Sequence, residues 1–289
     1  MQVTSVEHVS RMRQALQALC DDVGAFLDSS SLLPVADSAA RKEMADGRLS
    51  DQLLNAYHEG NLLLESAGDH AFALARLLVE PVPTVAPWTC ARGALEASAL
   101  SCWLLANDIS AHTRVSRSYA FRYDGLREQE KLARSSGDDA SRQRVVARMD
   151  EVETQATNLG YSRVQDKNGR RIGIGEGMPS MTKCIEDTFG QETLYRIFSG
   201  MAHSQSSPMI QLGFGAFDPA IPTLRKKAMN PDVAAVLLIT AADSLTKPTW
   251  AKAQLFGLDT RRLEQILEGR YKEMGVNETR SHWLSTGPS

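Results

Sequence analysis

The chain has 289 residues, a net charge of −3 and 43% hydrophobic residues, which is enough to bury a large core. Its near-neutral charge argues against a protein that coats nucleic acid non-specifically. The longest apolar stretches, at 97–106 and 233–242, are shorter than the roughly 20 apolar residues that a membrane span needs. We therefore expect no membrane segment.

The four cysteines contain no Cys-x-x-Cys pair. We expect them to be free thiols in a reducing cytoplasm rather than a disulfide framework. The first ten residues have no basic segment followed by an apolar run, so we expect no signal peptide.

Apolar residues recur at steps of three and four along most of the chain, which is the pattern of amphipathic helices. Pro81, Pro83 and Pro87 separate the second helix from the third, and Pro248 is expected to break the long C-terminal pattern. The expected helices, in chain order, are 3–27, 49–79, 88–106, 110–135, 141–159, 180–189, 191–203, 232–245 with a continuation to about 256, and 259–274.

The segment 161–177 departs from this pattern, because Asn168-Gly169 stands between two short alternating runs and indicates a β-hairpin. Gly-Phe-Gly at 213–215 is interpreted as a turn, and residues 282–289 as a frayed tail. We predict an all-α multi-helix bundle with a small hairpin or loop insertion near 161–177. We expect a single domain over 1–289, with 1–30 as a candidate helical subdomain and 49–274 as the helical core.

The predicted helix at 88–106 carries only two charged residues, Arg92 and Glu96, among small and apolar neighbours. A helix that is apolar on most sides should be central, and residues four positions apart can pair across one turn. A buried charge is costly unless it is paired. The pair is either a structural brace or the floor of a pocket in which the arginine binds an anion.

The next helix, 110–135, is rich in arginine. Arg117 and Arg122 flank Tyr119 on its apolar stripe, so they are candidates for a pocket edge that meets phosphate or another anion. The alternative for this helix is a solvated charged face.

The helix at 191–203 places Tyr195, Ser199 and His203 at steps of four, with Arg196 seven positions before the histidine. These spacings put phenol, hydroxyl, imidazole and guanidinium groups near one face, a combination suited to phosphate or anion chemistry. The plainer alternatives are a histidine at a helix C-terminus and a surface arginine paired with Glu192.

Metal and cofactor motifs are missing from the sequence. It has no His-Glu-x-x-His, no Glu-x-x-His and no Cys/His cluster, so we expect no metal. Gly173, Gly175 and Gly177 lack the strand–helix context of a dinucleotide site, and there is no Walker sequence, Gly-x-Ser-x-Gly elbow or DNA-binding motif. We expect no cofactor. His70 is interpreted as a core histidine.

Arg196-x6-His203 resembles the Arg-x(4–6)-His motif of HEPN-domain proteins, all-α bundles that include ribonucleases of defence and toxin–antitoxin systems. Arg-x3-Glu at 92–96, the arginine/tyrosine-rich helix and Tyr-x3-Ser-x3-His at 195–203 are similar to a related group of uncharacterised bacterial helical proteins. The resemblance covers about 49–203. The chain departs from the nuclease pattern at Ile197, where active members usually carry a polar residue.

The resemblance implies a metal-independent endoribonuclease and a homodimer, with His203 as acid or base and Arg196 stabilising phosphoryl charge. Lys167, Arg170 and Arg171 of the hairpin would then contact the RNA backbone. Two other functions fit the same residues. One is a non-catalytic module that binds a nucleotide, an anionic small molecule or a protein in a pocket of Arg92, Glu96, Arg117, Arg122 and His203 or Tyr195. The other is a small-molecule enzyme using that pocket.

Overall fold

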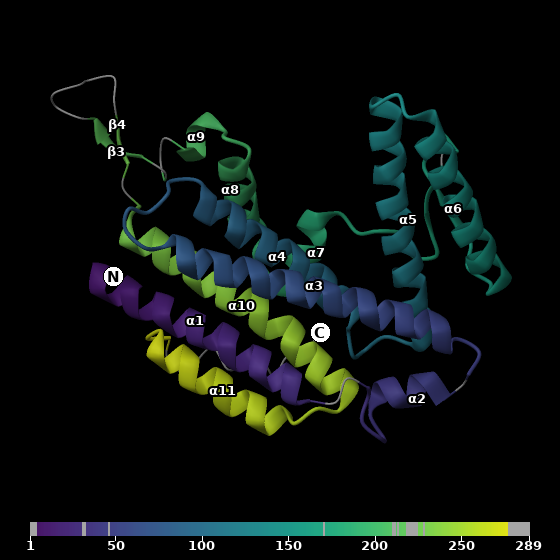
Figure 1. Ribbon diagram of the computed structural model, residues 1–289, viewed down its shortest axis with the longest axis horizontal. Helices are drawn as coiled ribbons and strands as arrows, with labels where there is room; N and C mark the ends of the chain where they lie inside the picture. The colour runs from purple at the N-terminus through teal and green to yellow at the C-terminus, as the bar shows by residue number, and fades with distance from the viewer. Residues whose placement is uncertain are drawn as a thin grey trace. The chain divides into compact units, whose positions relative to one another are not determined.

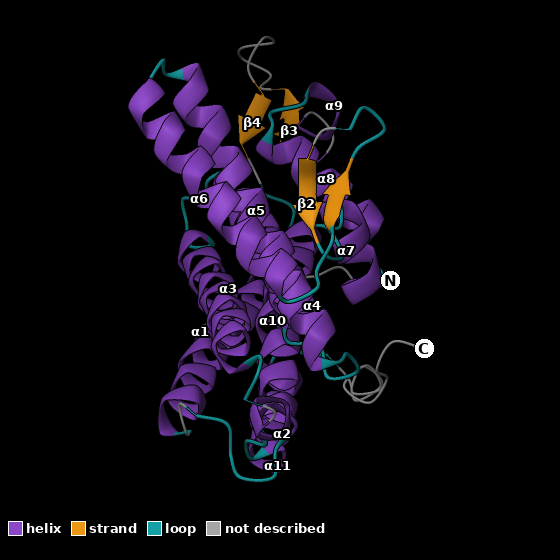
Figure 2. Cartoon of the chain, turned by 90° about the vertical axis from the view of Figure 1, so that its right-hand side faces the viewer, coloured by secondary structure: helices purple, strands orange, loops and turns teal. Residues whose placement is uncertain are grey.

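The computed structural model describes residues 5–30, 33–45, 47–169, 171–209, 212, 214–217, 225–227 and 229–276. The predicted all-α fold is confirmed, because helices dominate the described chain and strands form only two short antiparallel hairpins (Figures 1 and 2). No helix among these residues is long and apolar enough to cross a membrane. The predicted tail at 282–289 lies outside the described residues.

The chain divides into two compact units. Unit 1 comprises residues 1–41, 60–107 and 181–289, and unit 2 comprises 42–59 and 108–180. Unit 1 holds α1 (Val6–Ser29), α4 (Ala86–Leu104), α7 (Met181–Phe189), α8 (Glu192–Ala202), α9 (Ser206–Pro208), α10 (Pro231–Phe256) and α11 (Thr260–Glu273). The helix α3 (Ser50–Leu77) contributes its first part to unit 2 and the rest to unit 1.

The centre of unit 1 is α4, which packs against α7, α8 and α10. Its small and apolar residues are buried along most of its length, as its composition predicts. The helices α1 and α11 come from opposite ends of the chain and lie side by side in purple and yellow (Figure 1). The outcome is a bundle whose central helix carries two charged residues, Arg92 and Glu96, that pair with each other.

The prediction that Pro248 ends a helix is wrong, because α10 continues through it to Phe256. Proline removes one N–H and clashes with the preceding turn, which costs about 3 kcal/mol in an isolated helix. Here Leu245, Pro248 and Thr249 are all buried, and α10 packs against α1 and α4. Tertiary packing therefore outweighs the local penalty.

Unit 2 is built around α5 (Ala111–Ser135) and α6 (Asp139–Asn158), which pack against each other. The predicted hairpin follows them: β1 (Arg163–Gln165) pairs with β2 (Arg171–Ile174), with Arg163 opposite Ile174. Gly169 has φ +73°, a left-handed conformation that glycine adopts without strain in the connecting turn.

Four elements were not predicted, namely the short helices α2 (Ala39–Ala45) and α9 and the strands β3 (Phe214–Phe217) and β4 (Arg225–Lys227). The helix α2 crosses the boundary between the units. Of the segment interpreted as a turn at 213–215, Phe214 and Gly215 belong instead to β3, which is paired with β4, and Gly213 lies outside the described residues. That interpretation is wrong for Phe214 and Gly215, because their strand pairs with β4, which begins eight positions after β3 ends.

Candidate functional site

Four of the predicted site residues come together in unit 1. On α4, Arg92 donates from Nε to Glu96 Oε1 at 2.8 Å, across one helical turn. Tyr195 on α8 donates its hydroxyl to the same oxygen at 2.9 Å. His203, the residue that caps the C-terminus of α8, places Nε2 3.0 Å from Arg92 Nη1. We call these residues the Arg92 cluster.

The Arg92 guanidinium is held on three sides. Glu96 fixes Nε, His203 meets Nη1, and the Tyr195 ring lies 5.9 Å from the guanidinium carbon. Partial burial opposes the charge, but the hydrogen bond and charge of Glu96 outweigh it and raise the pKa of Arg92. Its side chain keeps 22% of its exposure, so solvent reaches the group.

Protonation states follow from these contacts. An arginine has no acceptor, so His203 Nε2 must accept its hydrogen bond, which places the proton of the neutral ring on Nδ1. Burial, together with the Glu96 carboxylate, raises the pKa of Tyr195 and keeps its phenol protonated as a donor. The cluster therefore contains one cation, one anion and two neutral polar groups.

Apolar contacts set the distance between the two helices that supply the cluster. Trp88, one turn before Arg92, meets Phe198 of α8 edge to face at 5.7 Å between ring centroids. The ring of His70 lies so close to Gly93 of α4 that a Cβ there would be 2.6 Å from Nε2. His70, interpreted from the sequence as a core histidine, is half-buried and lies against Gly93.

The other predicted residues of α8 have different surroundings. Arg196 is exposed and donates from both Nε and Nη2 to Glu192, the surface pairing weighed above. No contact among the described residues joins Arg196 to His203. Ser199 contributes its backbone carbonyl, which accepts the His203 N–H at 3.0 Å and so helps to end the helix.

The predicted ligand residues of α5 belong to unit 2 and have carboxylate partners there. Arg117 donates to Glu176 at 2.9 Å, and Arg122 lies 3.8 Å from Glu59 and stacks over Tyr119. In the hairpin, Arg171 pairs with acidic residues of α6. Arg170 lies outside the described residues. The predicted pocket residues therefore fall into two groups: Arg92, Glu96, Tyr195 and His203 lie in unit 1, and Arg117, Tyr119 and Arg122 lie in unit 2.

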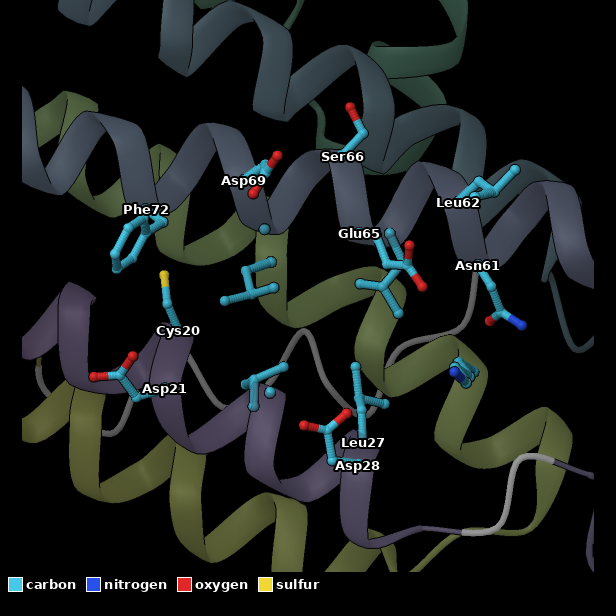
Figure 3. Close-up of a pocket in the computed structure, with 16 residues that line it drawn as sticks. Cys20, Asp21, Leu27, Asp28, Asn61, Leu62, Glu65, Ser66, Asp69 and Phe72 are labelled. Carbon is cyan, nitrogen blue, oxygen red and sulfur yellow. The ribbon is translucent and has the colours of Figure 1, made fainter.

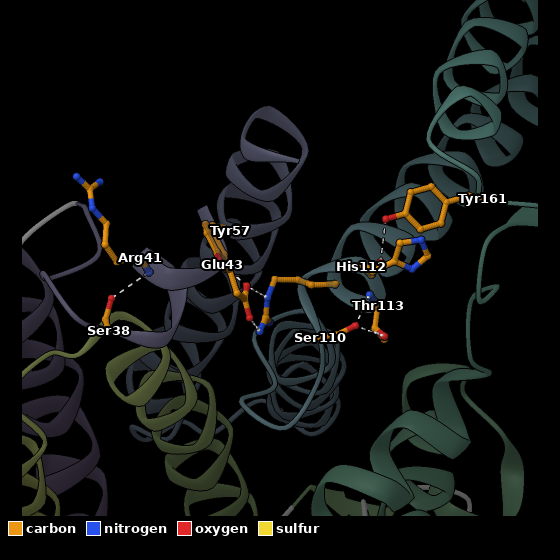
Figure 4. A network of polar contacts seen from close by, with 9 residues as sticks. Ser38, Arg41, Glu43, Tyr57, Ser110, His112, Thr113 and Tyr161 are labelled. Atoms are coloured by element: carbon orange, nitrogen blue, oxygen red, sulfur yellow. Dashed lines mark hydrogen bonds and ion pairs between the residues drawn. The ribbon is translucent and has the colours of Figure 1, made fainter. Parts of the chain in front are cut away.

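Unit 2 contains a second arginine–glutamate–tyrosine group (Figure 4). Arg114 donates to both oxygens of Glu43, at 2.9 and 3.0 Å, and Tyr57 donates to Oε2 at 2.7 Å. The guanidinium carbon lies 5.7 Å from the Tyr57 ring, and the Arg114 side chain is fully buried. We call this the Arg114 group. The sequence reading missed Glu43 and Tyr57, because nothing in the sequence links α2 to α5.

No group of three or more histidine, cysteine, aspartate or glutamate side chains suited to a metal occurs in the described part of the chain. Comparisons of the chain with protein-family models, curated proteins and solved structures gave no match. The fold and site define a helical protein with a solvent-accessible arginine–histidine cluster, and function must be argued from that cluster.

Proposed function

We propose that unit 1 is a binding module for a small anionic ligand, with a phosphate or carboxylate group held by Arg92. The observation that carries the proposal is the 3.0 Å contact between Arg92 Nη1 and His203 Nε2, since it places a guanidinium beside an imidazole from a distant segment whose Nδ1–H can also donate to an anion. The partial exposure of Arg92 leaves this point open to solvent.

Glu96 orients the Arg92 guanidinium and does not itself attract the anion. It engages Nε of Arg92, and Tyr195 also hydrogen-bonds to the arginine, so a ligand oxygen would take the guanidinium N–H groups that these partners leave. Because Glu96 offsets the arginine charge, selectivity must come from directed hydrogen bonds more than from net charge. Tyr195 holds Glu96 in turn, so both partners of the ion pair are fixed before a ligand arrives.

The test is a thermal-shift panel on the full chain with inorganic phosphate, adenosine monophosphate and uncharged adenosine. A ligand at a hundredfold excess over its Kd stabilises by about 2.7 kcal/mol, which raises the melting temperature by several degrees. We expect a rise with an anion and none with adenosine. Arg92→Ala should abolish it, while Arg196→Ala, an exposed arginine paired within α8, should leave it unchanged.

A shift that survives in Arg92→Ala, or that is lost equally in Arg196→Ala, would place anion binding elsewhere. Arg92→Lys separates charge from geometry. It keeps the positive charge and loses the planar fork, so it should retain only a small part of the shift.

A second candidate is the metal-independent ribonuclease that the resemblance implies, with Arg92 in the role first given to Arg196. The same contact favours it, because His203 can act as base at a 2′-hydroxyl while Arg92 stabilises the phosphoryl oxygens. In the free chain Arg92 occupies the Nε2 lone pair of His203. A substrate phosphate would have to draw the guanidinium away before the histidine could take a proton.

Metal-free RNA cleavage tests this candidate. Wild type should cleave in the presence of a chelator, His203→Ala should lose at least a hundredfold in rate, and Arg196→Ala should keep it. The resemblance also implies a homodimer, which light scattering measures. Absence of chelator-resistant cleavage by wild type sinks the nuclease candidate and leaves the binding proposal standing.

A further inference from the structure

A groove in unit 1 lies apart from the Arg92 cluster. It runs between α1, α3 and α10 and encloses a cavity of about 720 Å³ (Figure 3). In Figure 3, α1 supplies Cys20, Asp21, Leu27 and Asp28, and α3 supplies the facing residues from Asn61 to Phe72. The described lining contains neither Arg92 nor His203.

Acidic side chains lie at both ends of this groove. Asp21 and Asp28 are seven positions apart on α1, which separates them by about 10 Å along the helix. Glu65 and Asp69 are four positions apart on α3, about 6 Å along its axis. Figure 3 places Asp21 toward the Asp69 and Phe72 end and Asp28 toward the Glu65 and Asn61 end.

Between the acidic ends the lining is apolar and small. Val23, Leu64 and Leu245 are buried there, and Gly24 and Gly68 add no side chain. A Cβ on Gly24 would meet nothing within 4 Å, so the absence of side chains keeps the groove wide at this point. A methylene chain is the kind of group that such a middle section accepts.

One polar group in the lining, Asn61, points to a ligand with N–H donors. The carboxamide oxygen of Asn61 is buried and has no hydrogen-bond partner among the described residues, which is costly unless a donor reaches it. Lys252 lies in the lining and interacts with Glu65, so its single charge offsets one of the four carboxylates. Burial, with the nearby Asp21, raises the pKa of Cys20 to about 12, so this thiol adds no negative charge.

We propose that this groove binds a linear alkyl polyamine, with an ammonium group at each acidic end and methylenes across the apolar middle. The charge pattern of the groove indicates the ligand class. Such a ligand has a cationic group at each end, an apolar link between them, and an N–H donor for Asn61. The exposed position of the four carboxylates makes the binding sensitive to salt.

The test is calorimetric titration of the full chain with spermidine and with diamines from diaminopropane to diaminodecane. Affinity should pass through a maximum at intermediate chain length, because only such chains reach both acidic ends. A monoamine of equal length should bind at least tenfold more weakly. Glu65→Gln and Asp21→Asn should each weaken the best diamine about tenfold.

Glu7→Gln is the matched control, since Glu7 is exposed on α1 and lies outside the groove. It should leave the affinity unchanged. Equal losses in Glu7→Gln and Glu65→Gln, equal binding of monoamine and diamine, or no binding at low salt would each overturn the proposal. Arg92→Ala should keep diamine binding, so the outcome is separable from that of the anion site.

Discussion

Each of the two units contains a charged group built from the same three residue types. Each contains an arginine, a glutamate that accepts from it, and a tyrosine that donates to that glutamate while its ring lies against the guanidinium. The distances from guanidinium to ring are 5.9 Å in the Arg92 cluster and 5.7 Å in the Arg114 group.

The difference lies in what remains accessible. Arg114 is fully buried and donates from Nε and Nη2 to both oxygens of Glu43, so the group is closed. Arg92 donates to its glutamate from Nε alone, and its side chain is partly exposed to solvent. A second partner, His203, contacts its Nη1. The closed group is a structural brace, and the open one has donors to offer a ligand.

The largest expected effect separates the two arginines by stability. Arg114→Ala leaves Glu43 without its buried partner and should lower the free energy of unfolding by about 3–5 kcal/mol. Arg92→Ala, in a partly exposed pair, should cost about 1 kcal/mol or less. Urea denaturation measures both. If the two losses are equal, the distinction between brace and site is wrong.

A third carboxylate, Glu59, makes the stability of unit 2 depend on pH. Burial raises its pKa from 4.5 to about 7, against the lowering effects of the Ser118 hydrogen bond and Arg122. Between these values the folded chain keeps the proton that the unfolded chain has lost, so the free energy of unfolding falls as pH rises. The fall is roughly 3 kcal/mol and is complete above about pH 7.

Glu59→Gln removes this group while keeping its shape. The difference in unfolding free energy between variant and wild type, measured from pH 4 to 8, should grow in favour of the variant as pH rises. A pH-independent difference contradicts the assignment.

A smaller effect tests how firmly α4 is fixed beside Arg92. Gly93→Ala would place a methyl group 2.6 Å from His70 Nε2 and should cost about 1–3 kcal/mol through overpacking. Gly125→Ala is the control, because its Cβ meets nothing within 4 Å and alanine favours a helix by about 1 kcal/mol. Melting temperatures should move in opposite directions, and two shifts of one sign would argue against a rigid α4.

The smallest effect compares the two phenols. Tyr57→Phe removes a donor from a closed group and should cost about 1.5 kcal/mol or more, whereas Tyr195→Phe should cost less than about 1 kcal/mol. Chemical denaturation of both variants gives the comparison. A larger loss for Tyr195→Phe would mean that the Arg92 cluster is the more important brace.

Local chemistry predicted the Arg92 cluster in part. The i,i+4 pair in an apolar helix and the Tyr195–His203 spacing were visible in the sequence, and the structure joins them. Arg196 shares the helix of His203 but pairs with Glu192, since a long side chain on an exposed face reaches its i−4 neighbour first.

Contacts between residues far apart in the chain could not be predicted from the sequence. The partner of Arg114 is Glu43, far away along the chain, and no periodicity marks it. Pro248 remains inside α10 because buried packing on both sides outweighs a local rule. The acidic groove was missed for a similar reason, as its carboxylates come from two helices whose facing sides only the fold defines.

The most direct test of the anion-binding claim is an NMR titration of the histidine ring nitrogens with inorganic phosphate. The free chain should show His203 protonated on Nδ1, as its contact with Arg92 requires. Phosphate should shift the His203 signals saturably and leave His70 unmoved, and Arg92→Ala should abolish the shift. A His203 that does not respond, or that responds equally in Arg92→Ala, would contradict the account.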